Sequence, residues 1–203
     1  KGVYSSTDHG DFWTADTVGL GYDPAIPGFS NATVGIAHIG SKLYAVKDLG
    51  KGVYASPTDT IRWVRIGNYS AVFGGVGWKP LFAGIDTNVF AATYGGVFMY
   101  SGSDTTWFKR SDGLPEYLSS PILTAVDSLL FLYTGSVNEI YVSGDLGLHW
   151  EPFGTSDLAN KAIESIASTK THVIAATSID TWRLAVKDVV LSTEDEGQTL
   201  PFR

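Results

Sequence analysis

The sequence contains no cysteine, which excludes disulfide bonds, thiolate metal sites and thiol catalysis. Basic residues are also few: 14 Lys and Arg stand against 21 Asp and Glu, for a formal net charge of −7. Because binding to a nucleic-acid backbone depends on clustered Lys and Arg, we expect no nucleic-acid partner. No run of 18 apolar residues occurs, so the sequence predicts no membrane span.

The 203 residues instead have the composition of a globular chain, with 44% hydrophobic and 17% charged residues. The 23 glycines and the 13% aromatic residues favour short strands joined by tight turns. The chain begins at Lys1 without a Met or a signal peptide, and we therefore expect a processed or truncated N-terminus.

One short motif recurs along the chain, in the form Ser-x-Asp-x-Gly-x-x-Trp, called the box below. Two full copies occur, at Ser6, Asp8, Gly10 and Trp13 and at Ser143, Asp145, Gly147 and Trp150. A near copy occurs at Thr193, Asp195, Gly197 and Leu200, and two eroded copies occur at Ser56, Thr58, Thr60 and Trp63 and at Ser101, Ser103, Thr105 and Phe108. The copies end 42 to 50 residues apart, which suits a unit of about four short strands.

Short apolar runs precede the boxes in a constant order. The first run of each unit occupies residues 34–37, 81–85, 122–126 and 163–167, and the second occupies residues 43–46, 89–92, 130–133 and 173–176. The third directly precedes the box, at residues 3–4, 53–54, 97–98, 140–141 and 190–191. Runs this short, bounded by Gly, Ser, Asp and Asn, predict buried strands.

The box at this spacing resembles the Asp-box, or BNR repeat, of sialidase-like β-propellers. The resemblance implies an all-β propeller of about five blades, each a four-stranded antiparallel sheet with an Asp-box turn between the third and fourth strands. We expect a single domain over residues 1–203, made of a half blade at 1–31 and blades at about 32–78, 79–119, 120–160 and 161–203. Either the ring closes as a compact five-blade form with a thin blade, or closing it requires a missing chain segment or an oligomer, because an open sheet edge is a liability.

The box itself is predicted to be structural. Its Asp can accept backbone N–H groups within a turn, its Gly supplies a positive φ, and its Trp packs on the sheet. The alternative is that Asp8 and Asp145 are catalytic acids or calcium ligands. Calcium needs several converging oxygen ligands, and most boxes offer a single Asp. We expect no metal and no cofactor, because the four histidines show no metal-ligand spacing.

Ligand binding is expected on the face opposite the boxes, where long loops link one blade to the next and carry aromatic residues. Aromatic rings can stack on sugars, and carboxylates can accept hydrogen bonds from hydroxyls. Each of these aromatics could instead pack into the core. The candidates are Tyr22, Tyr69, Phe73, Trp78, Asp112, Glu116 and Tyr117, with Trp182 and Arg183 on a loop at residues 178–187.

The function expected from these features is a non-catalytic recognition or scaffolding propeller that binds a glycan, in an extracellular or periplasmic location. One alternative is a fragment or relative of an Asp-box glycoside hydrolase, either xyloglucan-cleaving, which needs two facing carboxylates, or sialidase-like. A sialidase needs an arginine triad, and this chain has five arginines and lacks the Phe/Tyr-Arg-Ile-Pro motif. A protein-binding propeller of the receptor or assembly-factor type is the other alternative.

Overall fold

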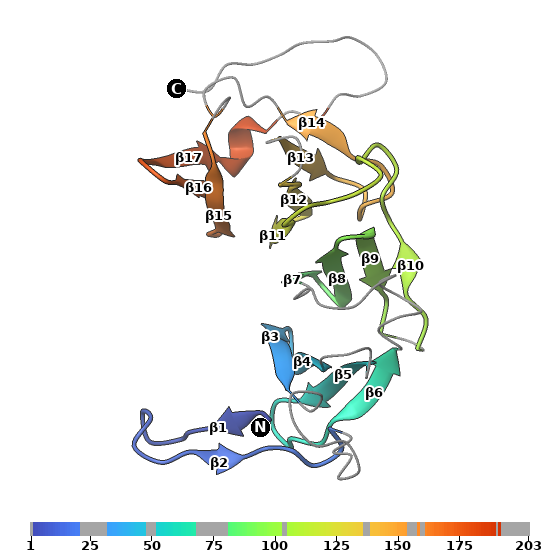
Figure 1. The fold of residues 1–203 in the computed structure, drawn as a ribbon, viewed down its shortest axis with the longest axis vertical. Coiled ribbons are helices and arrows are strands. Elements are labelled where there is room, and N and C mark those ends of the chain that lie inside the picture. The colour runs from blue at the N-terminus through green and yellow to red at the C-terminus, as the bar shows by residue number, and fades with distance from the viewer. Residues whose placement is uncertain are drawn as a thin grey trace.

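The computed structural model describes residues 2–20, 32–47, 52–67, 81–102, 105–135, 139–153, 158, 161–189 and 191. These residues form five antiparallel sheets that follow one another around an arc (Figure 1). Within the described residues, no helix is long and apolar enough to cross a membrane.

The sheets are numbered one to five in chain order. Sheet one consists of β1 (Tyr4–Ser5) and β2 (Thr14–Ala15), and sheet two of β3 (Thr33–Ile39), β4 (Lys42–Lys47), β5 (Gly52–Pro57) and β6 (Val64–Gly67). Sheet three consists of β7 (Leu81–Ile85), β8 (Asn88–Thr93), β9 (Gly96–Tyr100) and β10 (Phe108–Lys109). Sheet four consists of β11 (Ile122–Val126), β12 (Leu129–Tyr133), β13 (Ile140–Ser143) and β14 (Glu151–Phe153). Sheet five consists of β15 (Ile163–Ser168), β16 (His172–Thr177) and β17 (Thr181–Ala185), followed by a 3-10 turn at Val186–Asp188.

The predicted strands are confirmed at the first and second runs of sheets two to five and at the third runs of sheets one to four. The described residues give sheet one two strands, the number expected of a half blade, and give sheet five three strands. One expectation was wrong in detail. The third strand of sheet five is Thr181–Ala185 rather than residues 190–191, because it pairs with β16 directly after a short turn.

Apolar side chains fill the spaces between neighbouring sheets. The strand β8 shows why its sequence is almost continuously apolar: Val89 and Ala91 pack toward sheet two, whereas Phe90 and Ala92 pack toward sheet four. Successive residues of a strand point to opposite faces, so a strand buried on both faces needs apolar residues at every position. The first strands β3, β7, β11 and β15 lie on the inner side of the arc (Figure 1).

Tryptophan indoles connect consecutive sheets by hydrogen bonds. The Trp63 indole N–H donates to the Asp16 carbonyl at 2.8 Å, and the Trp150 indole N–H donates to the Arg110 carbonyl at 3.0 Å. Trp107 makes the equivalent bond to Ile66 at 3.3 Å. In each case the acceptor lies three residues after the tryptophan of the preceding sheet. We call this contact the indole clasp.

The indole clasp corrects the register of the third box. The sequence placed Phe108 at the end of that copy, but Trp107 is buried and makes the clasp, whereas Phe108 is 45% exposed. This box is therefore one residue shorter than the full copies. The Trp107 ring also stacks on Tyr100, with ring centroids 5.3 Å apart.

A glycine turn after the outer strand completes the clasp. The Trp63 and Trp150 amides donate to the Val18 and Asp112 carbonyls, each at 2.9 Å. The next residues, Gly19 and Gly113, have φ of +87° and +83°. A Cβ at either glycine would lie 2.0 or 2.1 Å from the carbonyl oxygen of the tryptophan, so only glycine permits this approach.

Replacing Trp63 with Phe should destabilise the fold by about 2–3 kcal/mol, because it removes a buried indole and its hydrogen bond. The matched control is Trp13→Phe. Trp13 is 63% exposed and donates to Gly10 of its own box, so this change should stay within about 0.5 kcal/mol. Urea unfolding of both variants measures the difference, and equal losses would contradict the clasp.

Candidate functional site

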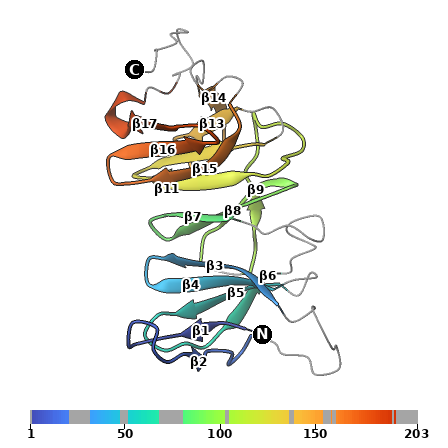
Figure 2. The same ribbon diagram turned by 60° about the vertical axis from the view of Figure 1, so that its left-hand side comes forward.

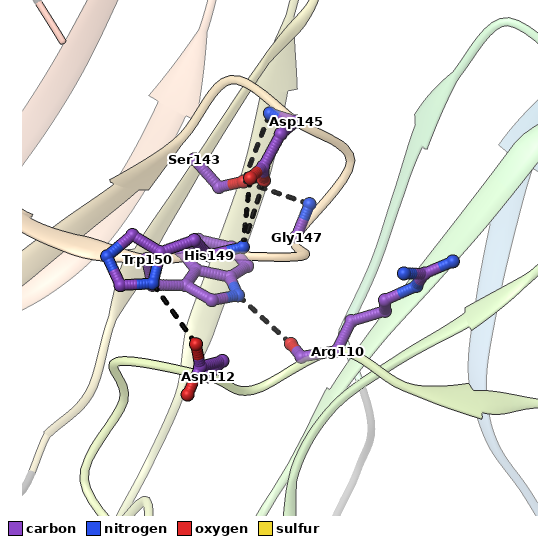
Figure 3. A network of polar contacts seen from close by, with 7 residues as sticks. All are labelled: Arg110, Asp112, Ser143, Asp145, Gly147, His149 and Trp150. Atoms are coloured by element: carbon purple, nitrogen blue, oxygen red, sulfur yellow. Dashed lines mark hydrogen bonds and ion pairs between the residues drawn. The ribbon is translucent and has the colours of Figure 1, made fainter. Parts of the chain in front are cut away.

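The box turns place their carboxylates within the turn itself. Between β13 and β14, the Ser143 hydroxyl donates to Asp145 Oδ1 at 2.7 Å and accepts the Gly147 N–H at 2.9 Å (Figure 3). Asp145 Oδ1 and Oδ2 accept the His149 N–H at 3.0 and 3.1 Å. The turn therefore uses the Asp as an acceptor for its own backbone and delivers Trp150 to the clasp (Figure 3).

The first box repeats this geometry almost atom for atom. Ser6 donates to Asp8 at 2.6 Å, the Gly10 N–H donates to Ser6 at 2.8 Å, and the Phe12 N–H donates to Asp8 at 3.0 Å. The Phe12 N–H, with the Ser6 hydroxyl, lowers the pKa of Asp8 below its ordinary value. A carboxylate held ionised in this way is suited to accepting hydrogen bonds rather than to donating a proton.

The eroded box of sheet two keeps its turn without the Asp. The buried Ser56 hydroxyl accepts the Arg62 N–H at 2.8 Å, the position that bonds to the Asp in the full copies. Among the described residues, no group of three or more His, Asp or Glu side chains could hold a metal ion. The Ser and Asp side chains of the two full boxes, and Ser56 of the eroded box, thus bond to the backbone of their own turns.

A pocket of about 660 Å³ opens on the opposite face of the sheets. Because consecutive strands alternate in direction, the turns between first and second strands share a face with the boxes; Figure 2 shows the β3–β4 and β7–β8 turns together on one side. The pocket lies where second strands end and first strands begin. Its polar lining consists of Thr93, Tyr94, Ser119, Ser120, Tyr133 and Glu164, and its apolar lining includes Leu81, Ile122 and Ile163.

Backbone hydrogen bonds fix the wall of this pocket. The Leu118 N–H donates to the Tyr94 carbonyl at 3.1 Å, and the Ser119 N–H donates to the Thr134 carbonyl at 2.9 Å. These bonds join the segment between sheets three and four to the ends of β8 and β12. The pocket is therefore shaped by backbone that is already paired, as expected of a preformed site.

Two tyrosines form an aromatic pair beside the pocket. The rings of Tyr94 and Tyr117 lie 5.7 Å apart and are 46% and 57% exposed. A hydrogen bond with Glu116 raises the pKa of Tyr117. Burial raises the pKa of Tyr133, and the Glu164 charge raises it further. Tyr117 and Tyr133 therefore stay neutral and can donate or accept hydrogen bonds at physiological pH.

No family model and no curated protein matches this sequence. Among solved structures, similar chains include Ycf48 bound to a D1 peptide (14% identity, TM-score 0.57, 86% of this chain and 54% of that one). They also include an ancestral GH74 enzyme (16% identity, TM-score 0.55, 90% of this chain and 28% of that one). A third is the extracellular domain of a putative one-component system from B. thetaiotaomicron (16% identity, TM-score 0.51, 73% of this chain and 21% of that one).

The fold is a β-propeller. The five sheets are its blades, and the predicted all-β propeller of about five blades is confirmed. The chain spans about half of the Ycf48 chain and about a quarter of the GH74 chain. At these identities the similarity establishes the fold alone.

The propeller brings only some of the predicted site residues together. Glu116 and Tyr117 lie beside the pocket, whereas Asp112 lies at the clasp, with its carboxylate 3.3 Å from His149 Nδ1 (Figure 3). Trp182 and Arg183 are in strand β17 rather than on a loop, which corrects the expectation. Outside the described residues lie Tyr22, Tyr69, Phe73, Trp78, Asp195 and Gly197.

A separate polar cluster surrounds Asp180 in the last blade. Its carboxylate accepts hydrogen bonds from Lys161 at 2.7 Å and from Thr177 and Trp182 at 2.6 Å each. The Lys161 ammonium also lies 4.2 Å from the centroid of the Trp182 ring. One face of that ring is therefore already occupied by a cation, which makes Trp182 a poor stacking surface.

Sequence reasoning missed Tyr94, Tyr133 and Glu164. It looked for binding residues in the long linking loops, but Tyr94 stands in the short turn after β8, Tyr133 ends β12 and Glu164 lies in β15. Their positions at the ends of predicted strands could have indicated them, because the strand ends of successive units meet on one face of a propeller.

Protonation of Asp180 in acid should lower the free energy of unfolding of the propeller. The hydrogen bond from Lys161, supported by Thr177 and Trp182, lowers the pKa of Asp180 from 3.8 to about 2. A lowered folded-state pKa stabilises the fold above about pH 4, and this contribution disappears as the pH falls toward 2. Urea unfolding between about pH 2 and 5 should therefore show a shallower pH dependence in Asp180→Asn, while Asp127→Asn, at an exposed turn, keeps the parent slope. Identical slopes for Asp180→Asn and the parent would refute the coupling.

Proposed function

We propose that this chain is an Asp-box propeller of the sialidase-like class that acts as a non-catalytic recognition or scaffolding module, in an extracellular or periplasmic setting. Its ligand is a glycan, bound in the pocket opposite the box turns. The observation that carries the proposal is the exposed Tyr94–Tyr117 pair at the edge of a preformed pocket lined by hydroxyl groups.

Membership of the Asp-box class is supported by the two full boxes. The second lies between the third and fourth strands of sheet four, and the first joins β1 to β2, the two described strands of sheet one. The Ser, Asp and Gly of both boxes make the same bonds, with lengths that agree within about 0.1 Å. A shared turn chemistry at a shared topological position is stronger support than the sequence match alone.

A glycan suits the pocket because sugars present both hydroxyls and apolar ring faces. The exposed hydroxyls of Ser119 and Ser120 can exchange hydrogen bonds with sugar hydroxyls, and the rings of Tyr94 and Tyr117 offer flat faces for stacking. The volume of about 660 Å³ lies in the range of small-ligand sites.

A binding role is favoured over glycoside hydrolysis by the carboxylates. Hydrolysis needs two carboxyl groups on either side of the scissile bond, one of them an acid with a raised pKa. Among the described lining residues only Glu164 carries a carboxyl group. Asp180 is held ionised, with a pKa of about 2, and so cannot serve as the acid.

A peptide is the second candidate ligand. The similarity that favours it is to Ycf48, whose structure was solved with a D1 peptide, over 86% of this chain. An extended peptide could use the same aromatic pair and hydroxyl groups, so binding assays should include both classes of ligand.

Replacing Tyr94 or Tyr117 with Ala should weaken glycan binding by about tenfold or more, because each change removes a stacking face. A glycan array on the parent chain would identify the ligand, and titration calorimetry would measure the variants. Phe12→Ala is the matched control, since Phe12 is an aromatic residue that is 79% exposed on the box face. Unchanged affinity in both tyrosine variants, or an array without hits, would refute the proposal.

A further inference from the structure

The pocket has an unbalanced charge. Glu164 is the single charged side chain among its described lining residues, and the other polar groups there are the hydroxyls of serine, threonine and tyrosine. A second carboxylate, Glu116, is hydrogen-bonded to Tyr117, whose ring contacts the lining residue Tyr94. The described surroundings of the pocket therefore present negative charge, neutral hydrogen-bonding groups and aromatic faces.

The described cation that stands nearest to Glu164 in the sequence contacts other groups. Lys161 stands three residues before Glu164, but its ammonium contacts Asp180 at 2.7 Å and lies over the Trp182 ring. The whole chain carries a net charge of −7, which adds a long-range attraction for cationic ligands. Because a charge-assisted hydrogen bond is about twice as strong as a neutral one, Glu164 is the group in the pocket best able to discriminate between ligands.

The tyrosine rings also favour a cationic ligand. The faces of tyrosine carry negative electrostatic potential, so the exposed ring of Tyr94 can attract a cation as well as stack on a sugar. The hydrogen bond with Glu116 raises the pKa of Tyr117, and burial, with the Glu164 charge, raises the pKa of Tyr133. A ligand anion would meet Glu164 without any compensating base among the described lining residues.

From these contacts we infer that the pocket selects glycans that carry a free amino group, with Glu164 pairing with the ammonium while the hydroxyls and tyrosine rings hold the sugar. The inference rests on the proposed glycan-binding function and specifies its ligand class. Sugars with carboxylates or sulfates are excluded from the site by Glu164, and N-acetylated sugars lose the ion pair.

The test compares two ligands that differ only in this group. Glucosamine oligosaccharides and N-acetylglucosamine oligosaccharides of equal length are titrated against the full chain at about pH 6, where an amine of this kind is protonated. The free-amine ligand should bind about five to ten times more tightly, and this advantage should shrink as salt is added. Glu164→Gln should abolish the advantage of the free-amine ligand over the acetylated ligand.

Asp127→Asn is the matched control, because it removes one exposed carboxylate from a turn on the box face. It should retain the preference for the free amine. Equal or tighter binding of the acetylated ligand would overturn the amine inference and leave the glycan function standing. Failure of both ligands, together with an array without hits, would overturn the glycan function itself, and binding of only a lysine-containing peptide would replace the glycan with the peptide class.

Discussion

The structure depends on one repeated interaction, the hydrogen bond from a buried indole N–H to a carbonyl of the preceding blade. A tryptophan at this position contributes a large apolar surface to the space between blades, and its N–H must find an acceptor once water is excluded. Trp63, Trp107 and Trp150 all find it three residues beyond the tryptophan of the blade before. These hydrogen bonds join each blade to the one before it at a constant spacing. A single blade buries little apolar surface alone, and packing against its neighbours makes it part of a continuous core.

This constraint explains what the boxes are for and where function can reside. Ser, Asp and Gly hold the turn that positions the tryptophan, so these residues of the box face have a structural role. The turns and linking segments of the opposite face do not contain the boxes, so side chains that bind a ligand can occur there. The pocket between the ends of β8 and β12 and the starts of β11 and β15 is the structural result of that division.

The sequence was sufficient to predict most of the strands, because buried strands of a repeat show as short apolar runs at a constant spacing. It misplaced the third box by one residue, since an Asp-free turn can shorten without changing the pattern of apolar residues, and only the hydrogen bond of Trp107 fixes the register. It assigned Trp182 and Arg183 to a loop because the box that normally follows a third strand lies farther along the chain in the last blade. It missed the pocket residues Tyr94, Tyr133 and Glu164, which lie at the strand ends of three blades and meet only when those blades pack.

The account is tested most directly by the exchange rates of the six tryptophan indole protons, measured by NMR in the intact chain. Protons held in a clasp exchange only when blades separate, whereas an exposed indole exchanges freely. The indole protons of Trp63, Trp107 and Trp150 should exchange slowly and lose their protection together as urea is added, and that of Trp13 should exchange fast from the start. Fast exchange at Trp63 and Trp150 in the folded chain would contradict the indole clasp and the division of faces that follows from it.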